Sequence, residues 1–201
     1  MTVLTVLQVA FAGWITWDGV RYLRSGQLQR HATVFMRRTP AEYARTLGLA
    51  LALGATTFAV GYSLYVAWPS VMSWTWLKLI AMPADGPVEG QNLNLAAVKF
   101  PWFGALFLLI LALNMPRLVR REEEVFRRGT KDWRDAVPRS LKFGMIHCLV
   151  GVPVSFGLAL AIPGLVFSAA YLRGGIRASA FLHTVYNLLI LSVAAFYILK
   201  F

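Results

Sequence analysis

The sequence has few cysteines and few acidic residues. Its 201 residues include one cysteine, Cys148, and only 9 Asp and Glu against 20 Lys and Arg. One cysteine cannot form an internal disulfide, and Cys148 lies beside an apolar run, so we interpret it as a packing residue rather than a nucleophile. The chain also lacks a linker, a low-complexity tract or an internal repeat, so we expect a single membrane domain over residues 1–201.

Charge is missing from long stretches of the chain. No Asp, Glu, Lys or Arg occurs from Ala178 to Leu199, and several runs approach or exceed the ~20 residues that a helix needs to cross a bilayer core. With 58% hydrophobic residues, the chain is predicted to be an integral membrane protein whose main partner is the lipid bilayer. The first apolar run lacks a basic region and a cleavage pattern, so we expect it to be retained. We therefore expect an all-α fold, a polytopic membrane bundle of about five to six helices.

The basic residues lie between the apolar runs. Six Arg and one acid occur over 21–45, and nine Lys or Arg occur over 117–142, whereas 68–100 holds two Lys and two acids. By the positive-inside rule, loops 21–45 and 117–142 face the cytoplasm and 68–100 faces outside. The net charge of +11 is thus assigned to topology in a bacterial or archaeal cell membrane, and we expect no nucleic acid partner.

The same pattern predicts where the chain crosses the membrane. The expected spans are about 3–23, 44–67, 100–116 and 178–200, with the Trp-rich 68–79 lying on the membrane surface. The third span is expected to end at Pro116. Residues 143–172 form either one crossing or a hairpin broken at 151–153. We favour the hairpin, because one crossing would place Arg173 and Arg177 outside.

Polar side chains inside apolar runs are rare and usually face a cavity or a bundle interior. His147 ends "FGMIH", one helical turn after Phe143, and His183 shares a helix face with Asn187 in "HTVYN". Three glutamates, 122–124, open "EEEVFR". Each feature also has a structural interpretation: a salt-bridged helix surface, a hydrogen-bonded histidine, or an asparagine that joins helices.

In this order, "EEEVFR", "FGMIH" and "HTVYN" resemble the EExxxR, FxxxH and HxxxN motifs of the CPBP family, the membrane-embedded CAAX proteases and bacteriocin-processing (Abi-type) enzymes. The resemblance covers about residues 100–200, the motif-bearing core, and includes "AAYLRGGIRASAFLHTVYN". It implies an intramembrane endopeptidase, a hydrolase that cleaves a membrane-associated peptide or protein. The motif-bearing helices would surround an intramembrane cavity.

The resemblance also implies roles for the motif residues. Glu122 and His147 would activate a water molecule, and His183 and Asn187 would stabilise the oxyanion. This chemistry is physically reasonable, because a carboxylate in a low dielectric suits general-base work. Donors that are preorganised in a dry site can stabilise a transition state by ~3–4 kcal/mol.

Two registers of the first motif fit the sequence, one ending at Arg127 and one at Arg128. The family commonly has Phe before the Arg, which favours Arg127. In that register Glu123 and Arg127 are expected to form an i, i+4 ion pair, leaving Glu122 free to meet His147.

Metal use is left open by the sequence. If a divalent ion such as zinc is present, its ligands would be Glu122, His147 and His183. No HExxH occurs, and the resemblance allows a metal-free water activated by glutamate, so the metal-free mechanism is favoured.

The chain departs from the family pattern next to the first motif. Arg128 stands where Gly often follows the Arg, and further arginines flank the motif. The alternative is therefore a catalytically silent scaffold or immunity subunit of a larger membrane complex. A proton or solute carrier is a weaker alternative, since the chain lacks inverted repeats and a series of intramembrane acids.

Overall fold

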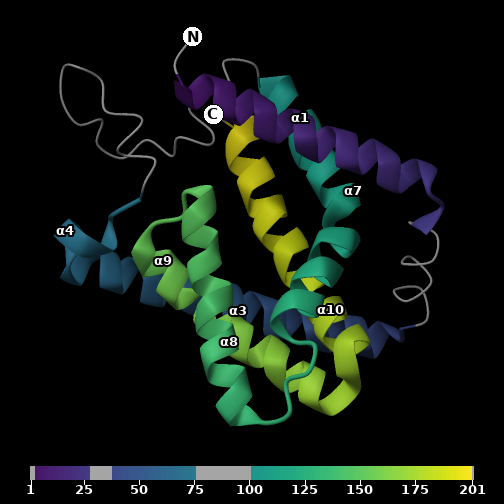
Figure 1. Cartoon of the computed structure of the whole chain (residues 1–201), viewed down its shortest axis with the longest axis vertical. Helices are drawn as coiled ribbons and strands as arrows, with labels where there is room; N and C mark the ends of the chain where they lie inside the picture. The colour runs from purple at the N-terminus through teal and green to yellow at the C-terminus, as the bar shows by residue number, and fades with distance from the viewer. Residues whose placement is uncertain (1–2, 28–37, 76–100, 201) are drawn as a thin grey trace.

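The computed structural model describes residues 3–27, 38–75 and 101–200. All regular secondary structure in these residues is helical, which confirms the expectation of an all-α fold. The elements along the chain are α1 (Val3–Arg24), α3 (Pro40–Ala67), α4 (Pro69–Met72), α7 (Pro101–Phe126), α8 (Trp133–Ile146), the 3-10 helix η1 (His147–Val150), α9 (Val154–Ala159) and α10 (Ala161–Lys200) (Figure 1).

The first two predicted spans correspond to α1 and α3. α1 agrees closely with 3–23, whereas α3 begins four residues earlier than the expected residue 44. The early start comes from a capping box. The Thr39 hydroxyl accepts from the Glu42 backbone N–H at 3.2 Å, and the Glu42 carboxylate accepts from the Thr39 N–H at 2.8 Å. The interfacial segment predicted at 68–79 includes α4, but its part after Thr75 lies outside the described residues.

The prediction that the third span ends at Pro116 is wrong, because α7 continues through this proline to Phe126. A proline inside a helix removes one backbone hydrogen bond, which neighbouring helices can compensate. Directly after the proline, Arg117 binds α1: its guanidinium donates to the Asp18 backbone O at 3.0 Å and pairs with the Asp18 carboxylate at 3.0 Å. Consequently "EEEVFR" begins within the final turns of a long helix.

The helical structure is interrupted between α8 and α10, at the 151–153 break that the hairpin interpretation assumes. After η1, Gly151 has a φ of 94°, which is a conformation that glycine adopts readily, and Pro153 precedes α9. A second break lies inside α10, where Gly175 has a φ of 68°. The predicted last helix, 178–200, is the half of α10 that follows this kink, and it rises beside α7 (Figure 1).

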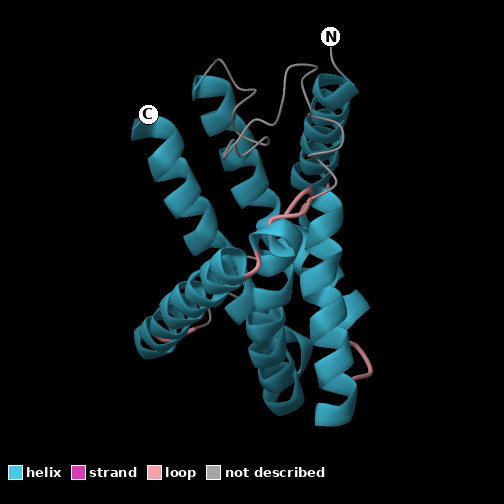
Figure 2. Ribbon diagram, turned by 90° about the vertical axis from the view of Figure 1, so that its left-hand side faces the viewer, coloured by secondary structure: helices cyan, strands magenta, loops and turns pink. Residues whose placement is uncertain are grey.

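The described helices converge near the middle of the molecule and separate toward the end that carries both termini (Figure 2). α10 packs against α7, α3 and α8 at this convergence. The buried hydrophobic cluster there comes from α3, α8 and α10: Ala50, Leu53, Phe143, Phe167, Leu182 and Tyr186. The polar motif residues lie against this cluster, so the packing of four helices fixes their positions.

Two described stretches, Pro40–Ala67 and Val154–Phe196, are long and apolar enough to cross a membrane. Most residues in the apolar windows of both stretches are not buried inside the protein. On α3, for example, Leu51, Phe58 and Tyr62 expose half or more of their surface. Such an apolar exterior indicates membrane association, since the core helix of a water-soluble domain would bury these side chains.

Candidate functional site

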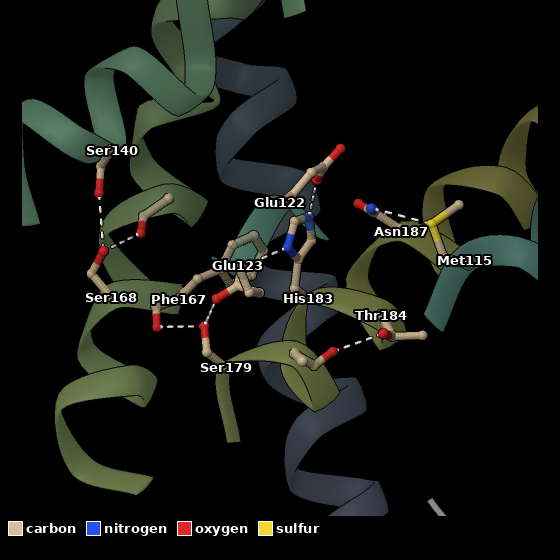
Figure 3. A network of polar contacts seen from close by, with 12 residues as sticks. Met115, Glu122, Glu123, Ser140, Phe167, Ser168, Ser179, His183, Thr184 and Asn187 are labelled. Carbon is tan, nitrogen blue, oxygen red and sulfur yellow. Dashed lines mark hydrogen bonds and ion pairs between the residues drawn. The ribbon is translucent and has the colours of Figure 1, made fainter. Parts of the chain in front are cut away.

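Helices α7 and α10 bring a glutamate and a histidine together in the protein interior. Glu123 is 0% exposed and His183 is 1% exposed. The His183 Nδ1 atom lies 2.8 Å from the Glu123 Oε1 atom (Figure 3). When Glu123 is ionised it can only accept hydrogen bonds, and Nδ1 is then the donor. Glu123 therefore fixes both the orientation of the imidazole and the proton on Nδ1.

Glu122 contacts the opposite nitrogen of the same ring. Its Oε2 atom lies 3.4 Å from His183 Nε2, and this oxygen is buried without a hydrogen-bond partner of good geometry. The carboxylate as a whole is more open, since 36% of the Glu122 side chain is exposed. Two acceptors at this distance repel each other unless one of them carries a proton. The Glu122–His183 contact is thus a place where a proton can be held and exchanged.

Ser179 completes the environment of Glu123, and sequence reasoning missed it. Its hydroxyl contacts Glu123 Oε2 and also lies 2.8 Å from the backbone O of Phe167 (Figure 3). Ser179 is 0% exposed. The spacing Ser179, His183, Asn187 is i, i+4, i+8, so all three share one face of α10. This spacing is the sequence signal that could have identified the serine.

Aromatic rings enclose the His183 imidazole. The Phe167 ring stacks on it with a centroid distance of 4.3 Å and an interplanar angle of 19°, and Phe143 meets it edge to face at 5.3 Å. Both phenylalanines are buried. The rings hold the imidazole in one orientation and keep water from its faces, so its polar contacts are restricted to the two ring nitrogens.

His147, the histidine of the second motif, also packs against Phe143. Its ring centroid is 4.9 Å from the Phe143 ring, and its Nδ1 donates to the Phe143 backbone O at 2.8 Å. Among the described residues it makes no hydrogen bond or ion pair with Glu122, so the expected meeting of these two is not realised. α8 ends at Ile146, and the His147 Nδ1 binds the preceding turn. Glu122 meets His183 instead.

The expected ion pair between Glu123 and Arg127 is also not formed. The Arg127 guanidinium lies over the Phe143 ring at 4.6 Å, and its three nitrogens have no hydrogen-bond partner in the described part of the chain. The two oxygens of Glu123 contact Ser179 and His183 instead. Burial lowers the pKa of Arg127, and the nearby Glu123 and Glu122 charges oppose this effect.

Asn187, the last motif residue, lies one helical turn after His183. Its Nδ2 donates to the Met115 sulfur on α7 at 3.4 Å (Figure 3). A thioether is a weak acceptor, so this bond holds the amide only loosely. Within the described ranges, Asn187 makes no hydrogen bond with His183 or the glutamates.

The metal set considered from the sequence is not assembled here. Among the described residues, no group of three His, Cys, Asp or Glu side chains is placed to hold a metal ion. Glu122 and His183 are adjacent, whereas the His147 Nδ1 is bonded to the Phe143 backbone O.

No family model matches the chain, and neither does any curated protein or solved structure. The resemblance to the CPBP family therefore depends on the three sequence motifs.

Proposed function

We propose that this chain is an intramembrane endopeptidase of the CPBP type, which hydrolyses a peptide bond of a membrane-associated substrate with a water activated by glutamate and histidine. One observation carries the proposal. Two glutamates of the first motif flank the two nitrogens of the His183 imidazole in the third motif, 60 residues along the chain. Buried acid–base pairs of this kind cost stability and are concentrated at functional sites.

The contacts suggest a division of roles between the two glutamates. Glu123 is buried and holds His183, so it orients the imidazole. Glu122 is partly exposed and adjacent to Nε2, so it can take a proton from water and pass it through His183 to the leaving amine. This differs from the roles that the family resemblance implies, where His147 accompanies Glu122. His147 keeps an available Nε2 and remains a second candidate for holding the water.

Stabilisation of the oxyanion is assigned to Asn187, and to His183 once its Nε2 has received the proton from Glu122. The Asn187 amide gives up only a weak bond to a sulfur when it turns to a developing oxyanion. The Arg127 guanidinium, buried near both glutamates, supplies a positive charge close to the site. Donors and charges of this kind are most effective where water is excluded.

The proposal includes a topology. Loops 21–45 and 117–142 would face the cytoplasm and 68–100 the outside, because the basic residues are concentrated in the first two. The first motif lies within 117–142, so substrate would enter from the cytoplasmic side of the membrane.

A second candidate function is a catalytically silent membrane subunit. It is favoured by one observation: among the described residues, neither His147 nor Asn187 makes a polar contact with the Glu122–His183 pair. In such a subunit the buried pair would serve only to hold α7 and α10 together.

The test compares membranes that contain the wild-type chain with membranes that contain Glu122→Gln, by mass spectrometry of protein N-termini. Glutamine keeps the shape of the partly exposed side chain but cannot accept a proton from water, so the new N-termini produced by the wild type should disappear. Glu124→Gln is the matched control, because Glu124 pairs with Arg120 at the surface. Identical N-termini with wild type and Glu122→Gln would exclude the peptidase and leave the silent subunit.

A further inference from the structure

Ser179 lies where three segments of the protein meet. Its hydroxyl contacts Glu123 of α7 and the backbone O of Phe167, which belongs to the first half of α10. Ser179 itself belongs to the second half, beyond the kink at Gly175. A single serine therefore connects α7 with both halves of the kinked helix, next to the Glu123–His183 pair (Figure 3).

The two carboxylate oxygens of Glu123 have different partners. Oε1 accepts from His183 Nδ1, and Oε2 contacts the Ser179 hydroxyl. A carboxylate that is held at one oxygen can still rotate about its terminal torsion, which is a soft degree of freedom. Contacts at both oxygens remove this rotation. The His183 imidazole is then held in one orientation as well, because Glu123 is the partner of its Nδ1.

We propose that Ser179 is a positioning residue that fixes the Glu123 carboxylate, and through it the Nδ1-protonated orientation of His183 in which Nε2 faces Glu122. This role rests on the proposed function for its catalytic consequence, but the arrangement itself can be measured without any substrate. Ser179 belongs to none of the three motifs.

Ser168 provides a matched control on the same helix. It is also 0% exposed, its hydroxyl donates to the Gly164 backbone O at 3.0 Å, and it lies 3.2 Å from the Ser140 hydroxyl. It makes no hydrogen bond with Glu123 or His183. Loss of this hydroxyl removes a buried hydrogen bond from α10 without touching the proposed arrangement.

The experiment follows the imidazole signals by nuclear magnetic resonance in detergent, with ¹⁵N-labelled histidine. The chain has only 3 histidines, and His147 is an internal reference because its Nδ1 binds backbone. In Ser179→Ala, we expect the Nδ1 proton of His183 to exchange with solvent about tenfold faster, the factor that loss of one hydrogen bond to a charged group produces. The His147 signals should not change, and Ser168→Ala should leave both histidines as in the wild type.

Two further variants distinguish loss of the hydroxyl from misfolding of the protein. Ser179→Thr keeps the hydroxyl and should keep the wild-type His183 signals, whereas Ser179→Cys offers only a weak donor and should give intermediate exchange. Unchanged His183 signals in Ser179→Ala, or an equal change in Ser168→Ala, would overturn the positioning role. If the signals change as expected but no variant, wild type included, releases new N-termini, the positioning role stands and the peptidase fails.

Discussion

At the residue scale, three consecutive glutamates lie in three environments. Successive residues of a helix point about 100° apart. Glu123 is buried against α10, whereas the Glu122 and Glu124 side chains are both 36% exposed and differ in their partners, which are His183 and Arg120. The same functional group therefore has a different use at each position. Burial and partners, rather than residue type, distinguish the orienting carboxylate from the proposed base.

The burial of Glu123 predicts a large loss of stability when it is removed. Glu123→Ala leaves the His183 Nδ1–H and the Ser179 hydroxyl without their partner in the interior, which should lower the free energy of unfolding by about 3 kcal/mol. Glu124→Ala removes only an exposed pair and should cost less than ~1 kcal/mol. Thermal unfolding of both variants in detergent measures the difference. Equal stability of the two would show that the Glu123–His183 contact does not hold the fold.

Because the Asn187 side chain makes only a weak bond, we expect its removal to reduce activity while leaving stability unchanged. Asn187→Ala should leave the unfolding temperature close to that of the wild type, since only a bond to the Met115 sulfur is lost. If the amide stabilises the oxyanion, kcat should fall by about 10²–10³. Ser192→Ala is the control, because the Ser192 hydroxyl binds only the Leu188 backbone O on the same helix. A kcat for Asn187→Ala within a few-fold of the control would contradict the oxyanion role.

Of the residues that the motifs single out, the structure brings His183 against Glu122 and Glu123, and the motifs did not predict how these three pair. The spacing of "HTVYN" places His183 and Asn187 on one face, and the structure brings His183 against both glutamates. The sequence could not show that Nδ1 meets Glu123 and Nε2 meets Glu122, because this depends on the relative rotation of α7 and α10. For the same reason, local i, i+4 spacing wrongly favoured an ion pair between Glu123 and Arg127.

At the scale of elements, the close packing of α8 against α9 and α10 holds the His147 segment in place. A Cβ atom at Gly144 would meet the Gly157 backbone O and come within 2.8 Å of the Ala161 backbone N. Backbone atoms cannot rotate away as a side chain can, so the helices would have to separate. Gly144 precedes His147 by one turn, and any separation moves the second motif.

We therefore expect Gly144→Ala to lower the free energy of unfolding by about 1–3 kcal/mol through overpacking. Gly48, in the interior of α3, has nothing within 4 Å of its Cβ position. There the same substitution should be neutral or stabilising by up to ~1 kcal/mol, because alanine favours helix. Thermal unfolding of the two variants side by side is the measurement. A neutral Gly144→Ala would show that α8 can move away from α9 at little cost.

The ends of helices could be predicted where they depend on local sequence. They could not be predicted where they depend on contacts with another helix. The range 3–23 agrees with α1, and a break was expected at 151–153. The start of α3 was missed because the Thr39–Glu42 capping box was overlooked, although it can be read from "TPAE". The end of α7 could not be read locally, since Pro116 is tolerated in a helix that α1 supports through Asp18.

At the scale of the whole molecule, the described helices are apolar outside and polar at their meeting point. Leu51 and Phe58 on α3 are exposed, while Ser168, Ser179 and His183 on α10 are buried. Water-soluble domains show the reverse arrangement, with polar groups outside. Lipid around the helices accounts for the exposed apolar side chains.

The distribution of charge predicts the sidedness of the chain in the membrane. In a Cys148→Ser background, single cysteines are placed at Ser25, Ser70 and Lys131, which are all exposed. Because the basic loops 21–45 and 117–142 should face the cytoplasm, cysteines at Ser25 and Lys131 should react with a membrane-impermeant maleimide only in inside-out vesicles. The cysteine at Ser70 should react in intact cells. Labelling of Ser25 and Lys131 from opposite sides would rule out the proposed topology, and labelling of Lys131 from outside would place the entrance to Glu122 on the outer side of the membrane.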